Sequence, residues 1–355
     1  MKKVILGFLA SIGFLTILIV VGIYFIIQAF LGTLEQKQEN ITETTVLNLQ
    51  VGSVPFVDVN VDGDIFSFLQ HIRASSLFDT VTAIKHAAQD HRIKGIILNI
   101  EGSNITLAEA QELREALTLF KESKKKVYAF AYSFGEGGSG TTPYYLATIA
   151  DAIFMQPQGT VELTGYAIDS YFLKDLLDKH KIKPQLGRRE GYKGIIETYT
   201  NKDFSPETKE NLSNLLDNML GQVQDVLSKQ RGVENMDAMK LFEAAPYLDT
   251  MAVEQKLITK LLHKPEVKEL FKQDLQANPT FVTLKAYKRN IPKQTADHKF
   301  ALISVEGEIT TPVQNNTYGT NQGTPGQIAH QLRKAAEDTT IDAIILRINS
   351  PGGTV

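Results

Sequence analysis

The residues best suited to chemistry lie near residue 350, where a strand-like run ends in Asn349-Ser350-Pro351-Gly352-Gly353. Two successive glycines let backbone N–H groups point at a ligand without an intervening side chain, as the oxyanion hole of an acyl-transfer enzyme requires. The carboxyl end of a strand in a parallel sheet is also where ligands usually bind. Gly352 and Gly353 are therefore candidates for an oxyanion-hole turn, and an ordinary tight turn is the alternative.

Several other kinds of chemistry have no support in the 355 residues. There is no cysteine, which excludes disulfides, zinc ribbons, iron–sulfur clusters and thiol nucleophiles. The seven histidines show no metal-ligand spacing, and the glycine-rich stretch 135–140 lacks the lysine of a phosphate-binding loop. A net charge of -3 gives no general attraction to phosphate backbones. We expect no metal, no cofactor and no nucleic-acid partner.

Alternating strands and helices must position the candidate residues. The run 93–100 is short and largely apolar, which is typical of a buried parallel strand. Apolar residues recur at helical spacing over 77–88, with Asp79 as the expected cap, and over 106–126. Further strands are predicted at 54–59, 61–65 and 127–131. This alternation predicts βαβ units and an α/β fold with a parallel sheet.

An internal repeat is also visible in the sequence. Residues 87–98 align without a gap to residues 335–346, and residues 61–65 resemble residues 305–309. Chance seldom places a turn, a helix end and a buried strand twice in one order, so we predict a duplication. Coincidental similarity between βαβ units is the alternative. The first copy continues far beyond its strand and the second stops soon after Ile348, so the second copy is expected to be incomplete.

The amino-terminal segment differs from the rest of the chain. Residues 4–31 contain no charge, and this stretch exceeds the roughly 20 residues that cross a bilayer core. Its end fits a cleavage site poorly, so an uncleaved signal anchor is predicted, with a cleaved signal peptide or a buried soluble helix as alternatives. Lys2 and Lys3 precede the span, which places the amino terminus in the cytoplasm and the bulk outside it. We therefore expect a single-pass protein of the inner (cytoplasmic) membrane. Most of its chain would lie outside the cytoplasm, which in Gram-negative bacteria means the periplasm.

Several separated motifs together resemble one protease family. These motifs occupy residues 144–147, 156–159, 191–194, 204–207, 304–307 and 349–353. In this order they are similar to the long, duplicated, membrane-anchored members of the signal peptide peptidase A (protease IV) family, peptidase family S49, with the carboxyl-terminal part missing. The resemblance implies a crotonase-like (ClpP/crotonase) tandem repeat, its second repeat truncated, preceded by one N-terminal transmembrane helix.

The resemblance also implies a serine–lysine dyad, in which the family's lysine falls on Lys193 as general base. A lysine amine accepts a serine proton only if its pKa falls from about 10.4 towards neutrality, through desolvation or nearby positive charge. We expect Ile195 and Ile196 to supply the first influence, and Arg188 and Arg189 the second. One solvated lysine among many is the alternative.

The family's nucleophilic serine stands in a Ser-Gly-Gly-aromatic motif further along the second repeat, and the sequence ends before such a motif. Thr141 takes its place in the first copy. Pro143 removes a backbone donor there and no double glycine faces it, so Thr141 is expected to be structural. The chain as given is therefore expected to be inactive.

Four segments are expected along the chain. They are the signal anchor (1–31), a polar stalk (32–50), a first, non-nucleophile repeat whose helical extension carries the lysine base (51–295), and the start of the second, catalytic repeat (296–355).

The leading hypothesis is a membrane-bound serine endopeptidase that hydrolyses remnant signal peptides and other hydrophobic peptides. It is expected to be anchored by residues 4–31 and, by family resemblance, to be a homo-oligomer, a tetramer. The alternative is a truncated or decayed, non-enzymatic remnant that acts as a membrane-tethered binding or assembly partner. Acyl-CoA chemistry, which crotonase-like folds also host, is a third reading, but the export signal weighs against it because acyl-CoA is cytoplasmic.

Overall fold

The computed structural model divides the chain into two units, Met1–Asn40 and Ile41–Val355. Within the predicted anchor at 4–31 only four residues are described, so that prediction lies almost entirely outside the described part. No helix among the described residues is both long and apolar enough to cross a membrane. The described residues are 40–53, 56, 58, 76–136, 138–231, 238–292, 296–309 and 325–353, with Gly13, Val21, Gly22 and Tyr24.

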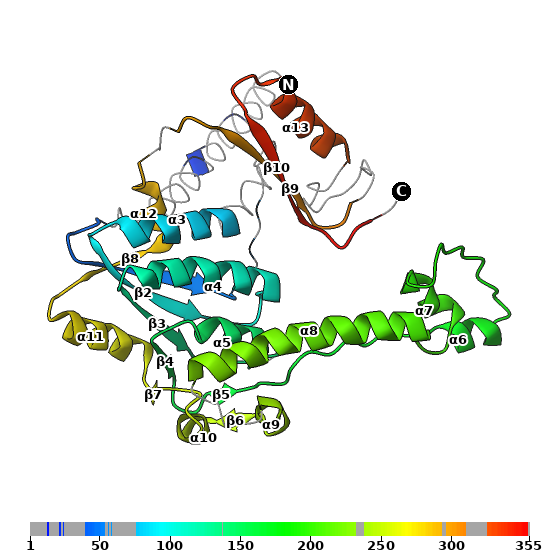
Figure 1. The fold of residues 1–355 in the computed structure, drawn as a ribbon, viewed down its shortest axis with the longest axis horizontal. Helices are drawn as coiled ribbons and strands as arrows, with labels where there is room; N and C mark the ends of the chain where they lie inside the picture. The colour runs from blue at the N-terminus through cyan, green and yellow to red at the C-terminus, as the bar shows by residue number, and fades with distance from the viewer. Residues whose placement is uncertain are drawn as a thin grey trace, which may run out of the picture. The chain divides into compact units, whose positions relative to one another are not determined.

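A six-stranded parallel sheet organises the unit that begins at Ile41 (Figure 1). Because both faces of such a sheet are covered, an uninterrupted apolar strand is stable at its centre. The strand predicted at 93–100 has this position, and seven of its eight residues are buried. The predicted α/β fold with a parallel sheet is confirmed. In spatial order the strands are β7 (Lys260–Leu261), β4 (Ala152–Met155), β3 (Lys126–Ala131), β2 (Ile93–Ile100), β1 (Thr45–Val51) and β8 (Thr280–Thr283).

Helices cover the two faces of this sheet and divide its side chains between two cores. Along β3, Val127 and Ala129 belong to the larger core, whereas Tyr128 and Phe130 belong to the smaller one with Phe271. The Tyr128 and Phe271 ring centroids are 4.4 Å apart. This alternation follows from the period of two along a strand. The larger core contains residues of α3 (Leu77–Gln89), α4 (Leu107–Glu122), α5 (Thr141–Ala147) and α12 (Leu284–Arg289), and the smaller one residues of α11 (Lys264–Leu275).

The two predicted long helices are present, but the cap of the first differs from the expectation. Ser76, not Asp79, is the N-cap of α3, and its hydroxyl accepts the Asp79 backbone N–H at 3.1 Å. Asp79 lies in the first turn, where a carboxylate favours the helix dipole. Thr106 and Glu109 form a reciprocal capping box at the start of α4.

The first strand begins earlier than the expected boundary at residue 51. β1 starts at Thr45 and pairs with both β2 and β8, and five of its seven residues are buried. Residues 45–50 therefore belong to the sheet and not to the predicted stalk, because their apolar side chains alternate into the two cores. The strands expected at 54–59 and 61–65 lie mostly or wholly outside the described residues.

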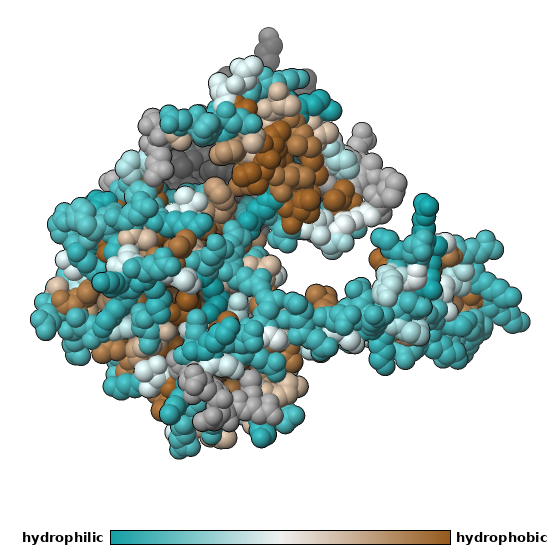
Figure 2. Space-filling model, in the orientation of Figure 1, coloured by the Kyte–Doolittle hydropathy of each residue, from teal (hydrophilic) through white to brown (hydrophobic). Residues whose placement is uncertain are grey.

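A second β–α–β unit follows near the carboxyl end of the chain. It consists of β9 (Phe300–Glu306), α13 (Pro325–Glu337) and β10 (Ala343–Asn349), with β9 and β10 parallel and paired along seven residues. Like α3, α13 has 13 residues. The tandem repeat itself stays a prediction. Figure 2 shows a hydrophobic surface over β9 and β10, where Phe300, Ile345 and Ile348 are more than half exposed.

The remaining elements lie between β4 and β7. The antiparallel pair β5 (Thr160–Val161) and β6 (Tyr247–Leu248) flanks the long helix α8 (Pro206–Arg231) in sequence. The shorter elements are α6 (Lys174–Lys179), the 3-10 helix η1 (Gly194–Ile196), α7 (Glu197–Thr200), α9 (Ala238–Glu243) and α10 (Asp249–Glu254).

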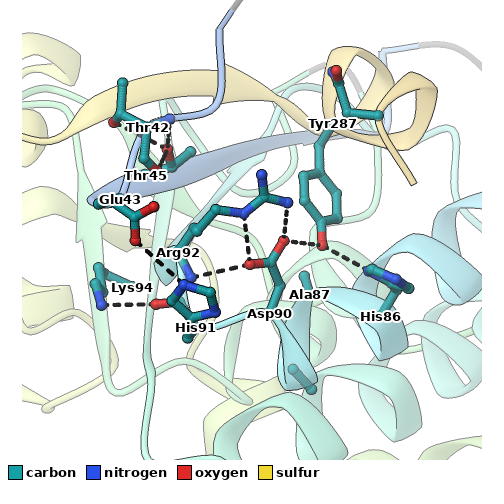
Figure 3. Close-up of polar contacts among 12 residues, drawn as sticks. Thr42, Glu43, Thr45, His86, Ala87, Asp90, His91, Arg92, Lys94 and Tyr287 are labelled. Atoms are coloured by element: carbon teal, nitrogen blue, oxygen red, sulfur yellow. Dashed lines mark hydrogen bonds and ion pairs between the residues drawn. The ribbon is translucent and has the colours of Figure 1, made fainter. Parts of the chain in front are cut away.

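A buried polar cluster joins the end of α3 to α12 (Figure 3). The Asp90 carboxylate accepts bonds from Arg92 Nε at 3.0 Å and Nη2 at 2.8 Å, and from the Tyr287 hydroxyl at 3.1 Å. His86 Nδ1 lies 2.9 Å from the same hydroxyl. The hydrogen bonds from Arg92 hold the pKa of Asp90 well below its usual value, although burial opposes them.

The Lys125 ammonium binds backbone carbonyls at the carboxyl end of α3. Its Nζ donates to the carbonyl oxygens of Ala87 at 2.7 Å, Ala88 at 2.9 Å and Asp90 at 2.8 Å. The last carbonyls of a helix lack partners within the helix, so the half-buried ammonium satisfies them and favours the dipole.

Candidate active site

Lys193 immediately precedes η1 and its side chain is exposed. The expected desolvation by Ile195 is wrong, because 84% of that side chain is exposed. Arg188 pairs with another group, since its Nη1 lies 2.8 Å from the Glu197 carboxylate. Lys193 is thus an accessible amine at the surface of this chain.

The turn around Lys193 is attached to the start of α8. The Tyr192 hydroxyl donates to Glu210 at 2.9 Å. Gly194 packs so closely on Thr208 that a Cβ there would lie 2.8 Å from Thr208 Cγ2 and would collide with its Oγ1. The close approach of the Thr208 side chain therefore favours glycine at position 194. Sequence analysis grouped the motifs at 191–194 and 204–207 by resemblance, and the structure shows that they pack together.

Glu197 is the residue that sequence analysis missed. Its side chain is almost fully buried, with 1% of the residue exposed. It accepts the Ser205 backbone N–H at 2.9 Å, the Ser205 hydroxyl at 2.6 Å and the Thr208 hydroxyl at 3.1 Å, besides pairing with Arg188. Burial alone would raise the pKa of Glu197, but these hydrogen bonds outweigh it and the pKa lies below its usual value.

α8 connects this turn to the larger core. Val223 and Leu227 in its second half are fully buried there. Thr208, in the first turn, lies fifteen residues before Val223, about 22 Å along the helix at 1.5 Å per residue. The lysine turn is therefore mounted on the far end of a helix whose other end is fixed in the core (Figure 1).

The glycine turn after β10 has structural reasons of its own. Gly352 has a φ of 102°, and its N–H donates to the Ser350 hydroxyl at 3.1 Å. Its carbonyl accepts the Ile309 N–H at 2.8 Å, and a Cβ on Gly353 would collide with the Ile309 backbone. Both glycines are thus required by local geometry. Their role as oxyanion donors stays a prediction, and in this conformation the Gly352 N–H is occupied.

Arg347 links the glycine turn to the first sheet. Its guanidinium lies 2.9 Å from Asp58 Oδ2 and makes two bonds to the Glu112 carboxylate, at 3.1 Å and 2.8 Å. Asp58 in turn accepts the Ser76 hydroxyl and the Phe78 N–H at the start of α3. Sequence analysis could not find this contact, because Arg347 and Glu112 are 235 residues apart.

Thr141 lies where the first copy would carry a nucleophile. It is fully buried at the start of α5, and its hydroxyl accepts the Gly165 N–H at 2.9 Å. A hydroxyl in this state stabilises the loop and does not face a substrate, which supports the expected structural role.

A hollow of about 190 Å³ lies at the carboxyl edge of β2 and β3. It is formed mainly by backbone turns and short polar side chains. Lys264 borders it, pairing with Glu101 at 2.5 Å. Among the residues that the structure describes, no three His, Asp or Glu side chains converge as a metal site. The lining residues are Ile100, Glu101, Gly102, Ser103, Tyr132, Ser133, Gly135 and Glu136.

The fold and these residues define an α/β protein that carries its candidate base in a turn attached to α8, outside the parallel sheet. Residues 119–278, which include Lys193 and α8, match the family model described as Peptidase family S49.

Two curated relatives carry the same name. Protease 4 of Haemophilus influenzae is 28% identical over 306 residues, covering 80% of this chain and 48% of the relative. Protease 4 of Salmonella typhi is 30% identical over 308 residues, covering 80% and 47%. The chain thus spans about half the length of the curated relatives it matches.

The chain is also similar to the solved structure of an enoyl-CoA hydratase/isomerase family protein from Silicibacter pomeroyi. The two are 13% identical, with 71% of this chain and 82% of the other covered and a TM-score of 0.33. A likeness this weak carries no argument, so the crotonase-like fold stays a prediction.

Proposed function

We propose that the protein is a membrane-bound serine endopeptidase that uses a Ser–Lys dyad to hydrolyse remnant signal peptides and other hydrophobic peptides. The observation that carries the proposal is the accessible Lys193, held on α8 by a buried network inside the residues that match the peptidase family. A serine hydroxyl needs such a base to become a nucleophile at neutral pH.

In the proposed mechanism the Lys193 amine takes the proton of a serine hydroxyl as its oxygen attacks the scissile carbonyl carbon. Backbone N–H groups of the Gly352-Gly353 turn stabilise the oxyanion, which requires the Gly352 N–H to leave the Ser350 hydroxyl. The protonated amine then gives the proton to the departing nitrogen. Water, deprotonated by the same amine, hydrolyses the acyl-enzyme.

Replacing the base tests this proposal in the full-length gene product. Lys193→Met should lower kcat/KM by about 10²–10⁴-fold on a hydrophobic peptide, the usual contribution of a general base. The matched control is Lys183→Met, which removes another exposed lysine that precedes η1 in sequence. Near wild-type turnover in the Lys193 variant would contradict the proposal.

The location of the nucleophile has a separate test. Residues 1–355 contain no Ser-Gly-Gly-aromatic motif, and Thr141 is buried and hydrogen-bonded. We therefore expect these residues by themselves to show no peptidase activity. Robust, Lys193-dependent turnover by this chain would show that the nucleophile lies within it.

Membrane attachment is part of the proposal. Its support is the absence of charge over residues 4–31 after Lys2 and Lys3, which favours a single-pass anchor with a cytoplasmic amino terminus. Carbonate extraction should leave the chain in the inner-membrane fraction, and deletion of residues 4–31 should release it. Release of the intact chain by carbonate would contradict the anchor.

Self-association, as a tetramer by family resemblance, is also proposed. Its support is a set of large apolar side chains exposed between residues 168 and 199, among them Tyr171 at 82% and Ile195 at 84%. α6 in the same segment buries no residue. Such apolar surface on one segment is typical of a protein interface. Tyr171→Ser should lower the mass measured by light scattering, and an unchanged mass would exclude this surface as the contact.

A further inference from the structure

The turn that carries Lys193 has almost no apolar core of its own. η1 buries no residue, and Glu197 is the buried residue of α7. Burial of apolar area therefore contributes little to fixing this turn. A polar interaction must hold it, because a catalytic base works only when its position is defined to a fraction of an ångström.

The Glu197 carboxylate supplies this interaction from the centre of the turn. Its four donors come from both sides of Lys193 in sequence: the Arg188 guanidinium before it, and the Ser205 N–H, Ser205 hydroxyl and Thr208 hydroxyl after it. Hydrogen bonds to an ionised carboxylate are short and about twice as strong as neutral ones. The carboxylate also lies at the N-terminus of α8, where the helix dipole favours a negative charge.

We propose that Glu197 is a positioning residue for the base. It fastens both ends of the Lys193 turn to the first turn of α8, and α8 carries that position to the core at Val223 and Leu227. The inference rests on the proposed function in one respect, namely that Lys193 is the base. It also gives the Phe204-Ser205-Pro206-Glu207 motif a role, since Ser205 provides two of the four donors.

Glu197→Gln is the sharpest perturbation, because it keeps the volume and removes the charge. One carboxylate oxygen becomes an NH₂ group that faces a donor, so the network cannot close. The other informative pair is Ser205→Ala, which removes the hydroxyl, and Ser205→Thr, which keeps it. Asp203→Asn is the matched control, since Asp203 is exposed and bonds to the N–H of the next residue, Phe204.

Hydrogen–deuterium exchange on residues 1–355 gives a readout that does not need activity. In Glu197→Gln we expect the amides of residues 188–205 to exchange at least about tenfold faster, because the loss of one charge-assisted hydrogen bond destabilises the closed turn by at least that factor. The amides of β2 should be unchanged, as should all amides in Asp203→Asn. Unchanged exchange over 188–205 in Glu197→Gln would overturn the inference.

Kinetics of the full-length gene product give the second readout. Glu197→Gln should lower kcat by about 10–100-fold with KM within twofold, because a misplaced base affects the chemical step more than binding. Ser205→Ala should behave alike, and Ser205→Thr should recover most of the rate. Wild-type kcat in Glu197→Gln would overturn the inference.

The two proposals fail in different ways. If Lys193→Met is inactive and Glu197→Gln keeps wild-type kcat, the positioning role is wrong and the proposed function stands. If Lys193→Met stays active, the proposed base is wrong, and the exchange experiment alone decides whether Glu197 holds the turn.

Discussion

Tyr287→Phe should destabilise the protein by about 1.5 kcal/mol. The substitution removes the hydroxyl that donates to Asp90 at 3.1 Å and lies 2.9 Å from His86 (Figure 3). A hydrogen bond to a charged group contributes about 1.5–3 kcal/mol. We expect a loss at the lower end of this range, because the Asp90 carboxylate keeps its hydrogen bonds to Arg92 and no buried charge is left without a partner.

Asp90→Ala should cost more, about 3 kcal/mol. It removes the acceptor of Arg92 and Tyr287 together, and breaking a buried charge pair costs about 3–5 kcal/mol. The Arg92 side chain is 34% exposed and can be rehydrated, which again favours the lower end. Once Asp90 is absent, Tyr287→Phe should cost less than in the wild type, because only the contact with His86 remains to be lost, so the two effects should not be additive.

Urea unfolding followed by circular dichroism measures these differences, provided that the m-value is unchanged. The matched control is Tyr132→Phe, because Tyr132 is 44% exposed and remote from α3 and α12 in sequence. A loss below about 0.3 kcal/mol for Tyr287→Phe, or additive effects of the two substitutions, would refute the network.

Three further predictions concern the same molecule. The lowered pKa of Asp90 means that its contribution is complete above the unfolded value of about 3.9 and is lost as pH falls through the folded value, so the urea midpoint of wild type should approach that of Asp90→Asn below pH 4. A parallel pH dependence of both proteins would contradict this. Lys125→Met should destabilise by about 1–3 kcal/mol, since the Ala87 and Ala88 carbonyls lose the Lys125 donor while the Asp90 carbonyl keeps the Ile93 N–H, and an unchanged melting temperature would show that water replaces the ammonium. Gly194→Ala should speed exchange over residues 188–205 because the new methyl collides with the Thr208 side chain; no effect of the substitution would disprove the tight contact.

Local patterns were sufficient for the two central strands of the sheet, β2 and β3. The apolar run at 93–100 predicts a buried parallel strand because such a strand is covered on both faces, and β2 has those bounds. Apolar residues at helical spacing predict α3 and α4, because one face of each helix packs against the core. β1 was missed altogether, because polar Thr45, Asn48 and Gln50 interrupt its apolar residues and conceal the strand.

The class of fold, the family resemblance and the choice of Lys193 as candidate base could be predicted without the structure, since each depends on short motifs and on their order along the chain. Only the tertiary structure revealed the roles of Glu197, Lys125 and Arg347. A charged residue reads as solvated in any sequence pattern, because exposure is its usual state. Whether it is buried instead depends on the donors and acceptors that the fold brings to it, such as Thr208, eleven residues along the chain, for Glu197, and Glu112, 235 residues away, for Arg347. The desolvation expected of Ile195 failed for the converse reason, because an apolar neighbour in sequence buries nothing unless the chain folds back over it.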